Sequence, residues 1–168
     1  MARSAQTWIQ QLGLQQHVEG GWYREVYRSP LSFQDDHLSA SFTGPRSACT
    51  HIYFLLEKGN FSAFHRIRSD ELWHFYDGDP IIIYEIDDAG KLKEHLLGND
   101  PEMSQSPFCM IPAGSWFASR VADEGAYGLV GCSVSPGFDF ADFELATRTD
   151  LTHQFPQHVG LIQALCRA

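Results

Sequence analysis

The residues best suited to chemistry lie close together, in residues 59–78. This segment contains His65 and Glu71 among bulky apolar residues. Side chains alternate between the two faces of a strand, so His65 and Ile67 are expected to share a face. A turn at residues 68–70 would bring Glu71 back on the neighbouring strand, close to His65. A histidine beside a carboxylate transfers protons or supplies half of a metal site.

The surroundings of this pair leave two roles open. Glu71 stands in the sequence ELWHFY, where burying an unpaired carboxylate is costly, and a partnership with His65 removes that cost. The structural alternative for His65 is a buried imidazole bound to a backbone carbonyl. Strict alternation from Glu71 places His74 on the opposite face, whereas a β-bulge would turn it inward. Turned inward, it would complete a two-histidine, one-carboxylate site for a divalent transition metal such as Fe, Mn or Zn: His65, Glu71 and His74.

Several further side chains are candidates for the wall of a ligand pocket. Tyr53 and Tyr84 fall in apolar strands and offer phenolic protons, although strand tyrosines usually pack in the core. Phe117 would suit stacking against a planar or sugar ring, unless it too belongs to the core. Charged residues in otherwise aromatic segments would close the pocket or form surface salt bridges. These are Glu19, Arg24, Glu25 and Asp139.

The elements that must position these residues are mainly short strands. Runs of β-branched and aromatic residues, such as 22–28 and 81–86, recur between turns rich in Gly, Pro, Asp and Ser. This pattern is typical of an all-β sandwich or barrel. A short N-terminal helix is expected between Ser4, a capping residue, and Gly13. A short C-terminal helix is expected at about residues 158–166.

The composition describes one globular domain, residues 1–168, with an acidic balance. Twelve Lys and Arg oppose 21 Asp and Glu, which gives a formal net charge of -9. The chain has no basic cluster, which argues against a nucleic-acid partner. It also has no apolar run long enough to cross a membrane and no signal-peptide pattern at its start. Four scattered cysteines suit buried thiols in a reducing compartment, so we expect a cytoplasmic protein.

Four ordered segments resemble the cupin superfamily. The first motif of that family, G-x5-H-x-H-x3,4-E-x6-G, is matched at Gly59, His65, Glu71 and Gly78. Ile67 replaces its second histidine, and Phe117 replaces the histidine of the second motif, P-x-G-x2-H. Two of the four usual metal ligands are therefore absent. The segments LGLQQHVEGGWYRE, HRIRSDELWHFYDG, IPAGSWFASR and VSPGFDFADFELA resemble in particular the cupin_5 (DUF985-like) subfamily, over residues 12–145.

The resemblance implies a double-stranded β-helix, a jelly-roll barrel with its site inside the mouth, and by analogy a homodimer. Cupins include oxygenases, isomerases, metal-free epimerases and binding proteins, so membership fixes no reaction. One candidate function is a metal-independent epimerase or isomerase acting on a sugar or sugar-nucleotide-like small molecule. In it His65 would be the base, supported by Glu71, with a pocket tyrosine as acid. The alternatives are a ligand-binding or sensing module, and a metal-dependent enzyme using His65, Glu71 and His74.

Overall fold

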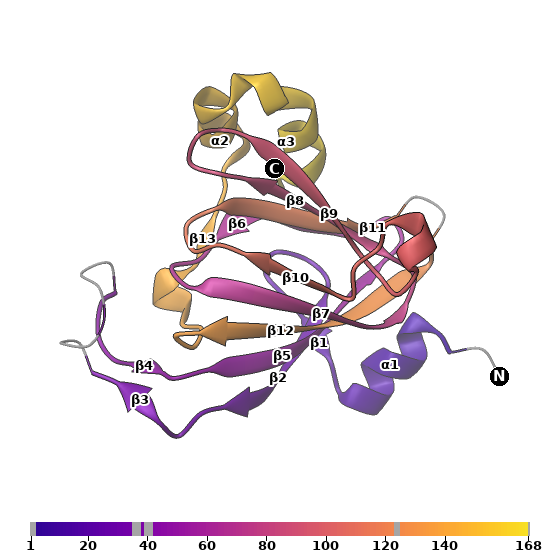
Figure 1. Cartoon of the computed structure of the whole chain (residues 1–168), viewed down its shortest axis with the longest axis horizontal. Helices are drawn as coiled ribbons and strands as arrows, with labels where there is room; N and C mark the ends of the chain where they lie inside the picture. Colours follow the sequence, from indigo (N-terminus) through magenta and orange to yellow (C-terminus); the bar gives the residue numbers. More distant parts are fainter. Residues whose placement is uncertain (1–2, 35–37, 39–41, 123–124, 168) are drawn as a thin grey trace.

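Two antiparallel sheets face each other in the computed structural model, which describes residues 3–34, 38, 42–122 and 125–167 (Figure 1). The six-stranded sheet contains, in spatial order, β1 (Gln15–Gln16), β2 (Trp22–Arg28), β5 (Thr50–Glu57), β12 (Tyr127–Ser135), β7 (Asp70–Gly78) and β10 (Phe108–Ile111). The five-stranded sheet contains β13 (Glu144–Leu145), β6 (Phe61–Arg66), β11 (Trp116–Val121), β8 (Ile81–Ile86) and β9 (Leu92–Leu97). The predicted all-β architecture is confirmed.

A small hairpin and several short helices complete the chain. The hairpin pairs β3 (Ser32–Phe33) with β4 (Arg46–Ser47) and projects from the body of the protein (Figure 1). The helices are α1 (Ala5–Leu12), α2 (Arg148–Gln154) and α3 (Val159–Leu165), with 3-10 turns η2 (Pro101–Met103), η3 (Phe140–Asp142) and η4 (Pro156–His158). In the described part of the chain, no helix is long and apolar enough to cross a membrane.

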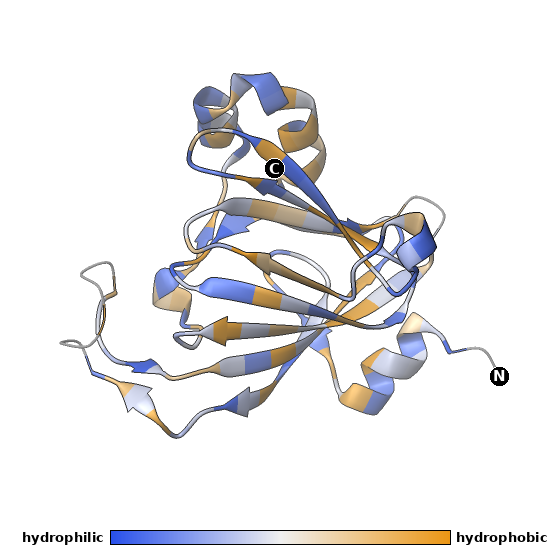
Figure 2. Ribbon diagram, viewed as in Figure 1, coloured by the Kyte–Doolittle hydropathy of each residue, from blue (hydrophilic) through white to orange (hydrophobic). Residues whose placement is uncertain are grey.

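The main core lies between the two sheets, where each strand turns every second side chain inward. Strands therefore change between hydrophobic and hydrophilic colours along their length (Figure 2). Phe54, Trp73 and Phe117 are the largest side chains of this core and are almost fully buried. At one end of the barrel the same alternation places polar side chains inward, and the cavity described below lies there.

Both predicted terminal helices are present. The Ser4 hydroxyl caps α1 by accepting a hydrogen bond from the Thr7 N–H (3.2 Å), and Gly13 ends it in the left-handed conformation (φ 62°). Helix α3 packs with α2 on the outer face of the five-stranded sheet. The sequence analysis did not predict α2, because Leu151 is its one buried residue and the segment shows no apolar stripe.

The predicted hairpin between the strands of His65 and Glu71 does not form. β6 belongs to the five-stranded sheet and β7 to the six-stranded sheet, so the turn at residues 68–70 crosses from one sheet to the other. His65 and Glu71 consequently approach each other across the barrel instead of along one sheet. Both side chains still face inward, because each strand keeps the alternation that the sequence indicates.

Candidate functional site

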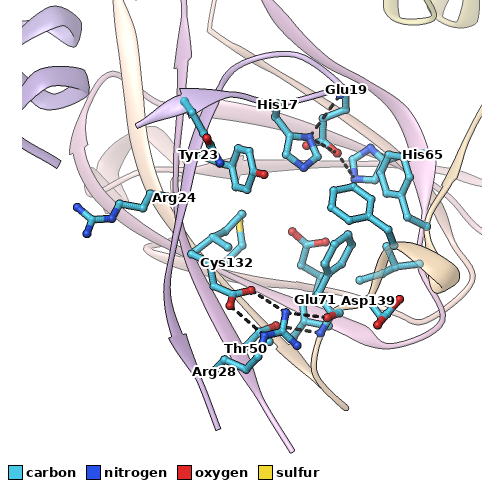
Figure 3. Close-up of a pocket in the computed structure, with 18 residues that line it drawn as sticks. His17, Glu19, Tyr23, Arg24, Arg28, Thr50, His65, Glu71, Cys132 and Asp139 are labelled. Atoms are coloured by element: carbon cyan, nitrogen blue, oxygen red, sulfur yellow. Dashed lines mark hydrogen bonds and ion pairs between the residues drawn. The ribbon is translucent and has the colours of Figure 1, made fainter. Parts of the chain in front are cut away.

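A cavity of about 460 Å³ opens between the sheets at one end of the barrel. Its polar side chains come from both sheets and from the segment before β2, and several of them, such as His17, Tyr23 and Glu71, point toward a common centre (Figure 3). Rings from the segment after β12 close one side. The lining includes His17, Glu19, Tyr23, Arg24, Glu25, Arg28, His65, Ile67, Glu71, Cys132, Phe138, Asp139, Phe140 and Phe143.

Six of the ten candidate residues line this cavity: Glu19, Arg24, Glu25, His65, Glu71 and Asp139. His65 and Glu71 are its deep polar groups, with exposed fractions of 2% and 8%. Arg24 contributes its stem, because its guanidinium points away (Figure 3) and donates a hydrogen bond to the carbonyl of Leu12 (2.8 Å).

Tyr53 and His74 lie on the outer face of the six-stranded sheet. Each alternates with an inward core residue, Phe54 and Trp73 respectively. The His74 ring lies 6.3 Å from that of His51 and 5.4 Å from that of Phe108, both outside the barrel. No bulge turns His74 inward, so the metal set His65, Glu71 and His74 is not brought together.

Tyr84 and Phe117 do not line the cavity either. Tyr84 faces the outer side of the five-stranded sheet, where its hydroxyl accepts a hydrogen bond from Arg120 Nε (3.2 Å). Phe117 points inward but is packed beneath the cavity wall, with its ring centre 4.1 Å from that of His65. It supports the histidine and leaves no face open for a ligand.

His65 has a different partner from the expected one. Its Nε2 lies 3.2 Å from Oε2 of Glu19, and its Nδ1 lies 2.7 Å from the carbonyl oxygen of Ala63. A carbonyl only accepts, so Nδ1 carries a hydrogen and Nε2 of the neutral ring is an acceptor. The contact between Nε2 and Glu19 therefore requires one shared proton, either on the carboxyl or on the imidazole.

Burial decides where that proton resides. Desolvation lowers the pKa of His65, although Glu71 opposes this effect, and desolvation raises the pKa of Glu19. Both directions favour the neutral pair, in which the Glu19 carboxyl donates to Nε2 of His65. The remaining oxygen of Glu19, Oε1, accepts a hydrogen bond from the Ser62 hydroxyl (2.9 Å). Glu19 is thus fully used within the protein.

The backbone fixes Glu19 beside His65. The N–H of Ala63, two residues before His65, donates to the carbonyl of Glu19 (2.9 Å), and Arg167 Nε donates to the same oxygen (3.1 Å). Gly20 follows with φ 114°, and an added Cβ there would collide with the Phe61 carbonyl. Glycine is therefore required for the chain to approach β6 this closely.

Glu71 is the carboxyl group that faces the open cavity. Burial raises its pKa to about 7; the nearby His65 lowers this value and Glu19 raises it. The Cys132 thiol donates a hydrogen bond to it. A carboxyl group with this pKa takes up and releases protons near neutral pH, as a general base or acid must.

Two hydrogen-bond donors face the same space. Nδ1 of His17 accepts a hydrogen bond from the Glu19 N–H (3.3 Å) and lies 3.4 Å from Oε2 of Glu19. With Nδ1 as an acceptor, the neutral ring carries its hydrogen on Nε2, which is turned toward the cavity (Figure 3). Desolvation lowers the pKa of His17, despite an opposing effect of Glu19, and favours this neutral form. The Tyr23 hydroxyl also points into the cavity, next to His17.

An ion pair stands at the mouth. Arg28 binds Glu25 through two hydrogen bonds (Nε–Oε1 2.9 Å and Nη2–Oε2 2.7 Å), and its Nη2 also donates to the carbonyl of Phe138 (3.1 Å). These bonds join β2 to the aromatic segment on the other side of the opening. They also engage the guanidinium that would otherwise serve an anionic ligand.

The donor set does not fit a cupin-type metal centre. Ile67 and Phe117 present carbon where that centre has histidines, and both nitrogens of His65 are hydrogen-bonded within the protein. Within the described ranges, no group of three or more His, Cys, Asp or Glu is arranged to hold a metal ion.

The chain belongs to the cupin superfamily, because the family model described as Cupin superfamily (DUF985) matches residues 6–146. The double-stranded β-helix that the resemblance to cupins implied is thereby confirmed.

Three similar proteins cover most of the chain. A protein of Shewanella oneidensis, SO0799, has a crystal structure 40% identical in sequence, with a TM-score of 0.89 and 99% of each chain covered. A hypothetical protein from Leishmania major is 34% identical, with a TM-score of 0.90 and coverage of 99% of this chain and 100% of that chain. The uncharacterized protein YML079W of Saccharomyces cerevisiae is 26% identical over 83% of this chain and 73% of its own length.

Sequence reasoning missed the parts of the site that lie outside the motifs. His17 was not singled out, and Glu19 was noted only as one charge among others. The signal was the sequence His-Val-Glu-Gly-Gly: two adjacent glycines after a carboxylate indicate a close backbone approach. The rings of Phe138, Phe140 and Phe143 were likewise visible as an aromatic run, but nothing in it indicated a cavity.

Proposed function

We propose that the cavity is the active site of a metal-independent enzyme that moves a proton on a carbon atom next to a carbonyl group, as epimerases and isomerases do. The observation that carries this proposal is Glu71: a buried carboxyl group, open to the cavity, with a pKa near 7. It replaces His65 as the proposed base, because both nitrogens of His65 are engaged within the protein.

The remaining groups supply the other half of the step. The Glu71 carboxylate takes the proton from carbon, and the electron pair of that C–H bond moves to the carbonyl oxygen. Nε2–H of His17 or the Tyr23 hydroxyl stabilises this oxygen by hydrogen bonding. For an epimer, an acid on the opposite face, the Tyr23 hydroxyl or Nε2–H of His17, gives a proton to the same carbon while the carbonyl re-forms. For an isomer, the old carbonyl oxygen keeps a proton from this acid, Glu71 returns its proton to the old carbonyl carbon, and the neighbouring hydroxyl gives its proton back to the acid as it becomes the new carbonyl. The His65–Glu19 pair holds the wall behind Glu71.

The test is hydrogen exchange in D₂O with a panel of aldoses, ketoses and small hydroxy-carbonyl compounds, followed by proton NMR. We expect the protein to exchange the carbon-bound hydrogen of at least one compound. Glu71→Gln, which keeps the shape and removes the base, should slow this exchange by about a hundredfold. The control Glu94→Gln changes an exposed carboxylate on β9 and should leave the rate unchanged.

Two results would overturn the proposal. One is exchange that is equally fast in Glu71→Gln. The other is a set of compounds that bind the cavity and remain unchanged after prolonged incubation, which would make the protein a binding or sensing module.

We also propose that two copies of the chain associate through the outer face of the six-stranded sheet. This face carries half-exposed apolar side chains, among them Tyr76 (43% exposed) and Phe108 (44% exposed). Hydrogen bonds hold the Tyr76 side chain in place on this face: its hydroxyl is bonded to His51 Nε2 (3.0 Å), and His51 Nδ1 is bonded to the Ser133 hydroxyl (2.8 Å).

Light scattering after size-exclusion chromatography should therefore give twice the chain mass. Tyr76→Glu and Phe108→Glu should each shift the protein toward the monomer, because a charge on this face must be desolvated in the dimer. Val159→Glu, at an exposed apolar position on α3, is the control and should stay dimeric. A monomeric wild-type protein would contradict the proposal.

We propose a cytoplasmic location because the cysteines form no disulfides. Cys109, Cys132 and Cys166 are buried and unpaired, and Cys49 is unpaired and half-buried. Free thiols of this kind persist in reducing compartments.

A further inference from the structure

The charges that face the cavity are predominantly negative. Glu71 lies at its centre, and the carboxyl groups of Glu25 and Asp139 lie at its mouth. Of the two arginines that line it, Arg24 turns its guanidinium outward and Arg28 is held by Glu25. Among the described residues that line the cavity, Arg28 is thus the one whose guanidinium stays at the mouth, and this group is already bonded to Glu25 and to the Phe138 carbonyl.

Aromatic rings enclose the space above Glu71. Phe138, Phe140 and Phe143 form a mutually packed cluster, with ring centres 5.0 to 6.3 Å apart. The His17 ring lies 6.2 Å from both Phe140 and Phe143. Phe140 is 55% exposed, although it lines the cavity, so the cluster leaves aromatic surface available to a ligand. Aromatic faces attract cations, and the attraction strengthens where water is excluded.

We infer that the cavity binds small molecules bearing an organic ammonium group, held between the Glu71 carboxylate and the rings of Phe138, Phe140 and Phe143. This deepens the proposed function, on which it rests, by naming its substrate class: an ammonium-bearing carbonyl compound in place of a phosphorylated or nucleotide-linked sugar. The rings attract the ammonium group by cation–π interaction, and the Glu71 carboxylate attracts it by ion pairing. A neutral ligand of equal shape lacks both attractions.

Binding of such a cation is linked to the ionisation of Glu71. The ligand pairs with the carboxylate form, so its affinity should rise as pH increases through about 7, where Glu71 loses its proton. A bound ammonium in turn favours the carboxylate, so the substrate itself would prepare the base for proton transfer. The titratable and charged groups facing Glu71 from the packed elements are His17, Glu19, Tyr23, Glu25, Arg28, His65, Cys109, Cys132 and Asp139.

Three compounds of related shape test the charge preference: choline, its neutral isostere 3,3-dimethyl-1-butanol, and phosphocholine. Their affinities for the full chain are measured by ligand-observed NMR at pH 6, 7 and 8. At pH 8, we expect choline to bind about tenfold more tightly than either other compound. Choline affinity should fall about tenfold between pH 8 and pH 6, whereas binding of the alcohol should not change.

Two variants locate the effect. Phe140→Leu keeps an apolar side chain and should weaken choline about fivefold while the alcohol binds as before; Phe33→Leu, on the separate hairpin, is the control. Glu71→Gln should weaken choline and abolish its pH dependence. Equal binding of choline and the alcohol, tighter binding of phosphocholine, or no choline binding would overturn the inference. Because binding is measured without turnover, such a failure leaves the D₂O exchange result intact, and the converse also holds.

Discussion

Asp142→Ala is expected to destabilise the protein by about 3–5 kcal/mol, the loss typical when one partner of a buried ion pair is removed. Asp142 and Arg46 are both buried and form two hydrogen bonds of 2.7 Å each, Nε–Oδ2 and Nη2–Oδ1. Without the carboxylate, the Arg46 guanidinium keeps carbonyl partners such as Thr43 and Gly44 but loses its counter-charge. The free energy of unfolding is measured in urea.

A second ion pair two residues further on provides the matched control. Arg66 and Glu144 also approach to 2.7 Å, but their side chains are 38% and 55% exposed. Solvent screens such a pair, so Glu144→Ala should cost no more than about 1 kcal/mol. Equal losses in the two variants would show that burial adds nothing to the Arg46–Asp142 pair. Asp142 is part of η3, so Asp142→Ala should also loosen this turn, which presents Phe140 to the cavity.

Local signals in the sequence predicted individual elements well. The capping Ser4 and the left-handed Gly13 delimit α1, and runs of apolar residues between turn residues delimit strands such as β5 and β8. The pairing of strands was harder, because alternation tells which side chains point inward and not which sheet a strand joins. β6 and β7 would each bury one face whether they paired in one sheet or lay in two facing sheets. Their short connection is compatible with both arrangements.

The same distinction explains which site residues were found. The resemblance to the cupin motif placed His65 and Glu71 inside the barrel, and alternation along the strand from Glu71 favoured an outward His74. The partnership of His65 with Glu19 depends on a backbone contact between Glu19 and Ala63, which are far apart in the sequence. Burial of Phe117 against His65 likewise depends on the register between β11 and β6. Only the folded chain supplies these contacts.

The pKa of Glu71 predicts how the stability of the protein changes with pH. The folded protein binds the Glu71 proton more tightly than the unfolded chain, where the carboxyl has its ordinary pKa of 4.5. Stability from this group is therefore complete below pH 4.5 and is lost as pH rises through about 7. The raised pKa corresponds to about 3 kcal/mol over that range. Glu19, whose pKa is also raised, acts in the same direction, whereas the lowered pKa values of His17 and His65 act in the opposite one.

Glu71→Gln isolates the contribution of this one carboxyl group. Glutamine does not titrate, so the variant should gain up to about 3 kcal/mol relative to the wild type between pH 4.5 and pH 8, measured by urea unfolding at each pH. The other buried groups are present in both proteins, and their effects largely cancel in the difference. Glu94→Gln, which removes an exposed carboxylate, is the control variant. If the Glu71→Gln difference does not vary with pH, Glu71 is ionised in the folded protein throughout this range, and its assignment as a base that is half protonated at neutral pH fails.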